Sequence, residues 1–78
     1  MKCLNAWIAQ MARRKRAYNE LKKRIGWKDA REVLYLVKRV TEGANNQAEL
    51  LERCCYKIRK GWALWQVKVE LMEMEDLW

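Results

Sequence analysis

The chain contains no histidine, serine, proline or phenylalanine, and Thr41 is its only threonine. Histidine is the most frequent general acid or base at neutral pH, and serine and threonine supply the hydroxyl nucleophiles of covalent catalysis. A chain without these side chains has almost no means of assembling an activated hydroxyl with its base. We therefore expect a protein that is not an enzyme and has no catalytic residues.

Cysteine is also scarce, with Cys3, Cys54 and Cys55 as the only three. A structural zinc site needs four nitrogen or sulfur ligands, which three cysteines cannot supply in a chain without histidine. An odd number of cysteines, two of them adjacent, does not fit a disulfide framework either. We expect reduced thiols that pack as small hydrophobic residues, a reducing, cytoplasmic compartment, and neither a metal nor another cofactor.

Long apolar runs are missing as well. No uncharged stretch approaches the roughly 18 residues that a membrane-spanning helix needs, so we expect no membrane span. The apolar residues near the N-terminus are interrupted by Asn5 and Gln10, which does not fit a secretory signal.

The 78 residues predict one small domain, residues 1–78, with five tryptophans to reinforce its core. Apolar residues at 3–4 spacing predict helices of about residues 4–25 and 30–42. Gly26 suits a left-handed end to the first helix, and Asp29 with Glu32 has the spacing of a capping box for the second. The expected fold class is all-α, a three-helix domain with a long C-terminal helix.

That third helix is predicted to cover residues 47–75, with Asn46 and Glu49 in the capping form at its start. Gly61 is a place where it could bend. Its main apolar seam keeps 3–4 spacing throughout and consists of Leu51, Cys55, Ile58, Trp62, Trp65, Val69 and Met72. Residues 65–71 also alternate between apolar and polar, as a strand does, and the sequence leaves helix and strand open there.

A seam this long exceeds what two other helices of a small chain can cover. A second apolar stripe widens it further and consists of Leu50, Cys54, Leu64, Leu71 and Trp78. We therefore expect a homodimeric helical bundle in which the seam forms the dimer contact or the core. On this interpretation Trp65→Ala removes a large buried side chain and costs about 3–5 kcal/mol.

Acidic residues are scarce outside the C-terminal region. Residues 1–60 hold 16 Lys and Arg against 6 Asp and Glu (+10), whereas residues 61–78 hold one Lys against four Asp and Glu (−3). A basic body implies an anionic partner. The acidic, hydrophobic ending, residues 72–78, has three interpretations: part of the core, a docking peptide, or a competitor for the body's cations.

The cations gather on outward-facing positions of all three predicted helices, and on the second and third a tyrosine lies between them. Such tyrosines suit phosphate contact with base stacking, although charged helix faces also serve solubility alone. The candidate residues for binding nucleic acid or an acidic partner are Arg13, Arg14, Lys15, Arg16, Lys23, Arg24, Arg31, Tyr35, Arg39, Arg53, Tyr56 and Lys60.

Two functions from different classes follow. The first is a small, basic, regulatory protein that binds nucleic acid mainly through phosphate contacts. The second is an accessory protein of the kind that bacteriophages and mobile elements encode, which inhibits or adapts a larger host protein machine by direct protein–protein binding.

Overall fold

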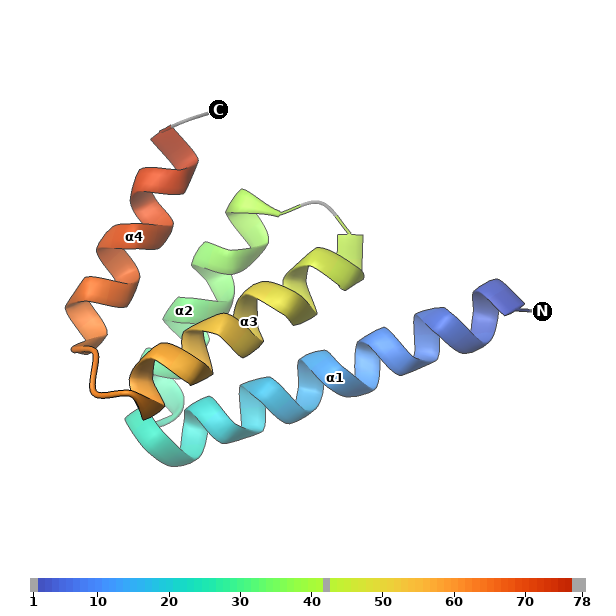
Figure 1. Cartoon of the computed structure of the whole chain (residues 1–78), viewed down its shortest axis with the longest axis horizontal. Helices are drawn as coiled ribbons and strands as arrows, with labels where there is room; N and C mark the ends of the chain where they lie inside the picture. The colour runs from blue at the N-terminus through green and yellow to red at the C-terminus, as the bar shows by residue number, and fades with distance from the viewer. Residues whose placement is uncertain (1, 42, 77–78) are drawn as a thin grey trace.

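The structure, a computed structural model, describes the backbone of residues 2–41 and 43–76 and the side chains of residues 8–41 and 46–75. It consists of four helices, α1 (Lys2–Ile25), α2 (Trp27–Val40), α3 (Gly43–Arg59) and α4 (Leu64–Asp76) (Figure 1). The described residues contain no strand, so the predicted all-α class is confirmed and residues 65–71 are helical. The prediction of three helices is wrong, because residues 47–75 form parts of two.

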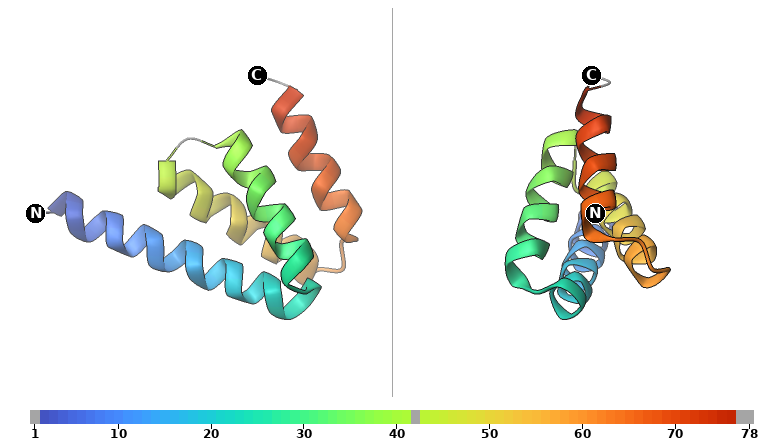
Figure 2. Two further views of the ribbon diagram at one scale, coloured as in Figure 1. Left: turned by 180° about the vertical axis from the view of Figure 1, so that it is seen from behind. Right: turned by 90° about the vertical axis from the view of Figure 1, so that its left-hand side faces the viewer.

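Helix α1 is the longest of the four helices. Its 24 residues extend over about 36 Å at 1.5 Å per residue, most of the 41 Å long axis. It packs against α3 and α2, whereas α4 packs against α2 and α3. Figures 1 and 2 place α4 at one end of the long axis and the N-terminal half of α1 at the other.

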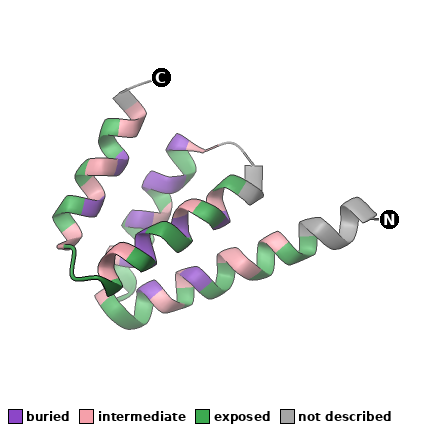
Figure 3. Cartoon of the chain, viewed as in Figure 1, coloured by how far each residue is buried: buried purple, intermediate pink, exposed green. Residues whose placement is uncertain are grey.

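The core lies where the four helices meet, and Figure 3 shows its buried residues in purple. Leu21, Val33 and Leu51 have no exposed surface at all. Ala17 gives α3 room to approach α1, and the Cys55 thiol donates a hydrogen bond of 3.2 Å to the Ala17 carbonyl. The other buried members are Ala30, Leu36, Val37, Val40, Ala48, Cys54, Val67 and Leu71.

The chain leaves α3 through a left-handed turn at Gly61, whose φ is +98°. The Trp62 N–H donates to the Lys57 carbonyl (3.0 Å) and the Gly61 N–H to the Ile58 carbonyl (3.1 Å). This pair of bonds is a Schellman motif, which ends a helix at a glycine. The long third helix expected from the sequence is therefore broken, not bent, at Gly61.

A new helix starts directly after this turn. The Gln66 side chain reaches back and accepts a hydrogen bond of 2.9 Å from the Ala63 N–H. A glutamine that bonds back to the N-cap residue three positions earlier is half of a capping box. Helix α4 thus has its own start signal and takes a direction independent of α3.

Because the helix breaks at Gly61, the apolar stripe that is buried on α3 does not continue as the buried stripe of α4. On α3 the predicted seam holds, because Leu51 and Cys55 are buried and Ile58 packs against the core. Beyond Gly61 it does not, because α4 buries Val67 and Leu71 instead. The remaining seam residues are exposed within the single chain by 43% for Trp62, 66% for Trp65, 42% for Val69 and 44% for Met72.

Two capping predictions were also wrong. Helix α2 starts at Trp27 with Gly26 as an N-cap that provides no side-chain bond, so Asp29 lies inside the first turn. Asp29 and Glu32 instead bind Lys68 of α4, with Lys68 Nζ 3.5 Å from Asp29 Oδ1 and 2.8 Å from Glu32 Oε2. Similarly, α3 starts at Gly43, so Asn46 lies within the helix.

The register of α4 can be tested with two valines. Val67→Ala should lower the free energy of unfolding by about 2 kcal/mol, because Val67 is 2% exposed and its loss leaves a cavity. Val69→Ala, the matched control on the exposed side, should change it by less than about 0.5 kcal/mol. Denaturant unfolding at low protein concentration measures both, and equal losses would contradict the register.

Candidate nucleic-acid interface

The basic run Arg13–Arg16 does not form one patch. Successive residues of a helix point about 100° apart, so four in a row cover all sides. Arg13 and Arg16 line a hollow beside α3, whereas Lys15 lines a different hollow beside α2. Arg14 lies between these directions and donates a hydrogen bond of 2.6 Å to the Gln47 side chain of α3.

Two adjoining hollows lie on α1: the first lies between α1 and α3, and the second is lined by α1 alone. The first, of about 310 Å³, is lined by Arg13, Arg16, Ala17, Glu20, Glu52, Cys55 and Arg59. The second, of about 530 Å³, is lined by Arg16, Asn19, Glu20, Lys23 and Arg24. Arg16 and Glu20 line both. We call this surface the α1–α3 face.

Ion pairs neutralise only part of the positive charge on this face. Arg13 contacts Glu52 through two nitrogens, with Nη2 2.5 Å from Oε1 and Nε 3.2 Å from Oε2. Glu20 lies 3.6 Å from Arg24 and 3.8 Å from Arg59. The other two cations of the face, Arg16 and Lys23, form no ion pair with any described side chain. The lining residues give five cations against two carboxylates, a net charge of +3.

The pair of Arg13 and Glu52 also shifts both ionisations. The hydrogen bond to Glu52 raises the pKa of Arg13. The hydrogen bond from Arg13 lowers the pKa of Glu52 below its ordinary value of 4.5, against the smaller opposing effect of burial. The Arg13 guanidinium is therefore held in place by a carboxylate that stays ionised at neutral pH.

An exposed aromatic ring continues the face along α3. Tyr56 lies four residues after Glu52 and three before Arg59, on the same side of the helix. Its side chain is 56% exposed, and Lys60 Nζ lies 5.5 Å from the ring centroid. Arg53, on the outer side of α3, is 3.8 Å from Glu49. The cation–tyrosine arrangement expected on this helix is therefore present.

The second tyrosine lies on another surface, the outer side of α2. Tyr35 is 60% exposed and Arg39 lies 5.7 Å from its ring centroid, with Arg31 exposed one turn earlier. Arg39, however, forms an ion pair with Glu75 of α4. The twelve candidates thus do not share one surface: Arg14 and Lys15 line the hollow between α1 and α2, and Arg31, Tyr35 and Arg39 lie on the outer side of α2.

The acidic C-terminal segment lies against the basic body. Besides the contact of Glu75 with Arg39, Glu70 pairs with Lys57 of α3. Met74 packs against the core. Within the described residues, Met74 therefore contributes to the core and Glu75 contacts a cation of the body. Leu77 and Trp78 lie outside the described residues.

Three charged residues of the α1–α3 face were not among the sequence candidates: Glu20, Glu52 and Arg59. The sequence carried a partial signal, because Glu20 and Arg24 have the i, i+4 spacing of a helical ion pair. Nothing local indicated that Glu52 would meet Arg13, which lies 39 residues earlier.

Two cysteine thiols are buried and unreactive by environment. Burial raises the pKa of Cys54 to about 11 and that of Cys55 to about 12. Neither forms a disulfide. In the described part of the chain, no three His, Cys, Asp or Glu side chains are grouped so that they could hold a metal ion. No described helix is both long enough and apolar enough to cross a membrane.

Comparisons with protein-family models, curated proteins and solved structures found no match to this chain.

The Glu52 contact predicts an acid-sensitive contribution to stability. A carboxylate whose pKa is lowered by folding stabilises the folded state above its unfolded pKa, and this contribution is lost as the pH falls through the folded pKa. Wild type should therefore be more stable than Glu52→Gln at pH 7, and the difference should shrink below about pH 4.5. Thermal melting of both proteins from pH 7 to pH 3 measures this. A difference independent of pH would show that Arg13 does not perturb Glu52.

The buried thiols predict resistance to alkylation. In a Cys3→Ala background, Cys54 and Cys55 should remain unmodified by iodoacetamide at pH 8 in the native state, because burial keeps both protonated and inaccessible. Both should react in denaturant, and intact-mass measurement counts the adducts. Rapid modification of the native protein would contradict the placement of α3.

Proposed function

We propose that this chain binds nucleic acid through phosphate contacts on the α1–α3 face. The observation that carries the proposal is the pair of adjoining hollows, in which five cations meet only two carboxylates among the described residues and Arg16 forms no ion pair with a described side chain. Surplus cations held this close together repel one another, and a phosphate placed between them relieves that repulsion.

The kind of cation also favours phosphate. Arginine guanidinium groups are planar and bind phosphate oxygens with two parallel hydrogen bonds. Arg13 is fixed by Glu52, and Arg16 opens to both hollows. A phosphate in either hollow would therefore meet the Arg16 guanidinium, which forms no ion pair with a described carboxylate, whereas Arg13 would exchange Glu52 for the phosphate.

Contacts of this kind position a nucleic acid without reading its sequence. Tyr56, at the edge of the face, offers an exposed ring on which a base can stack, which suits a single strand. We propose a non-enzymatic, regulatory role in which DNA or RNA is bound with little sequence preference.

Neutral substitutions test the α1–α3 face without adding a carboxylate to it. Arg16→Gln should weaken binding to every sequence alike and reduce the slope of log K against log salt by about 1, because one phosphate contact is lost. Glu52→Gln should tighten binding, because it frees Arg13 for phosphate. Fluorescence anisotropy of labelled single- and double-stranded oligonucleotides over a salt series measures both.

Arg31→Gln is the matched control, since Arg31 is an exposed arginine on the outer side of α2. It should change affinity less than Arg16→Gln does. Equal losses for the two arginines would indicate a diffuse attraction to the whole basic body. Looser binding by Glu52→Gln would contradict phosphate contact at Arg13.

The second function, inhibition or adaptation of a larger protein, is favoured by the apolar residues that α4 exposes. It takes the place of the first if the intact protein binds neither DNA nor RNA at about 50 mM salt, where phosphate contacts are strong. Purification from the native host with and without nuclease then separates a protein partner from a nucleic acid.

A further inference from the structure

Helix α4 carries a row of exposed apolar side chains on the side that faces away from the core. Trp65, Val69 and Met72 have i, i+4 and i+7 spacing, and Trp62 precedes them. The exposed fractions of 43% and 66% leave roughly 200 Å² open on the two tryptophans alone. With Val69 and Met72 the exposed apolar area reaches about 300–600 Å², which is the size of the largest apolar patch on a typical monomer. Such patches are often functional. We call this the α4 outer face.

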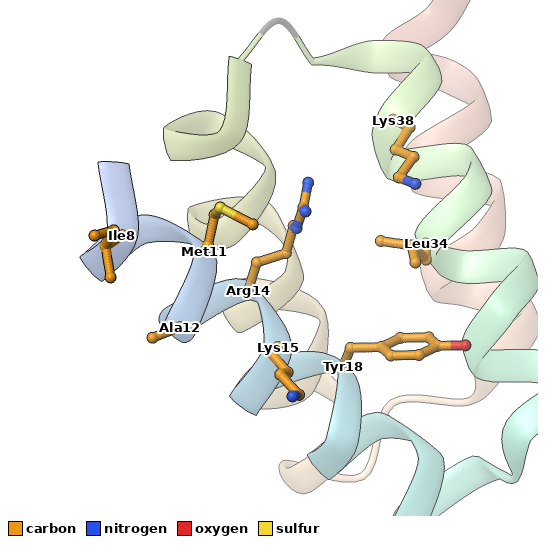
Figure 4. A pocket seen from close by; sticks show the side chains of 8 residues that line it. All are labelled: Ile8, Met11, Ala12, Arg14, Lys15, Tyr18, Leu34 and Lys38. Atoms are coloured by element: carbon orange, nitrogen blue, oxygen red, sulfur yellow. The ribbon is translucent and has the colours of Figure 1, made fainter. Parts of the chain in front are cut away.

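A groove between α1 and α2 offers a second apolar surface. It has a volume of about 580 Å³, and α1 supplies Ile8, Met11 and Tyr18 while α2 supplies Leu34. Figure 4 shows Tyr18 reaching from α1 toward α2, with Leu34 and Lys38 on the opposite wall. Ile8 is 54% exposed and Met11 37% exposed, so the apolar wall is open to a partner. We call this the α1–α2 groove.

The charges of the two surfaces are complementary. The described lining of the groove contains three cations, Arg14, Lys15 and Lys38, and no carboxylate. Lys15 and Lys38 form no ion pair with any side chain that the structure describes. On the α4 side, Glu73, next to Met72, is exposed and forms no ion pair among the described residues, whereas Glu70 and Glu75 already pair with Lys57 and Arg39 of the same chain.

We propose that the α4 outer face of one copy docks into the α1–α2 groove of a second copy. The outer face points away from the core, where α4 packs against α2, so it cannot enter the groove between α1 and α2 of its own chain. Each copy then offers one face and one groove, which is a head-to-tail contact that continues into a chain or closes into a ring.

This contact is independent of the proposed nucleic-acid binding, because the groove and the α1–α3 face use different sides of α1. It also replaces the symmetric homodimer seam with a contact between two different surfaces. A single helix in a groove falls at the small end of specific interfaces, below about 1,200 Å², so the association should be weak and weakened further by salt.

Sedimentation velocity without nucleic acid, from about 1 μM to 1 mM protein, tests the contact over the range of weak association. Wild type should grow beyond two copies or form a closed ring as concentration rises. Met11→Glu disables the groove and Trp65→Glu disables the outer face, so each variant alone should remain monomeric. Mixed together they should form a complex of one copy of each, because each retains the surface that the other lacks.

Trp27→Glu is the control for adding a carboxylate at an exposed ring outside both surfaces, since Trp27 is 59% exposed, and it should assemble as wild type does. Circular dichroism checks that each variant is folded, and Ile8→Glu with Val69→Glu provides a second pair. A Met11→Glu variant that still dimerises would indicate a symmetric α4–α4 contact and overturn the proposal. A wild type that stays monomeric throughout the range would overturn it as well.

Discussion

The left-handed turn at Gly61 is the constraint on which the rest of the structure depends. It ends α3 and lets α4 fold back onto α2, where Val67 and Leu71 complete the core. Lys68 then fixes the position of α4 by binding Asp29 and Glu32 together, and the hydrogen bond to Glu32 raises the pKa of Lys68. The same rotation turns Trp65 outward. One glycine thus determines both how the core is closed and which apolar surface remains for a partner.

The outcome shows what helical periodicity can and cannot predict. It gave the class, the extent of α1 and the buried side of α3, because those apolar residues have only one consistent stripe. Beyond Gly61 two stripes with similar spacing were available, one through Trp65 and Val69 and one through Leu64 and Leu71. Continuous 3–4 spacing from Leu51 onward favoured the tryptophan stripe, whereas the structure buries Val67 and Leu71. The signals that separate them, a helix-ending glycine and Gln66 three residues after Ala63, were present but local.

The candidate interface, like the fold, could be predicted from the sequence only in part. Periodicity indicates which residues of a helix point outward, and the exposed Tyr35 and Tyr56 agree with it. It does not indicate which outward residues of different helices become neighbours. Arg13 and Lys15, two positions apart, lie on different surfaces, while Arg13 and Glu52 meet across 39 residues. Predicting that contact requires the angle between α1 and α3, which small residues such as Ala17 set in three dimensions.

Helix α1 links the two proposed activities without making either depend on the other. Arg13 and Arg16 face α3, whereas Ile8, Met11 and Lys15 face α2, so binding at one surface removes no cation from the other. Head-to-tail contacts would bring several α1–α3 faces onto one nucleic-acid strand, and each bound copy would raise the local concentration of the next. Weak self-association and weak phosphate binding would then reinforce each other, and cooperative binding along a strand would follow. Met11→Glu should remove that cooperativity while leaving the affinity of a single copy for a short oligonucleotide unchanged, because the groove and the phosphate contacts have no cation in common.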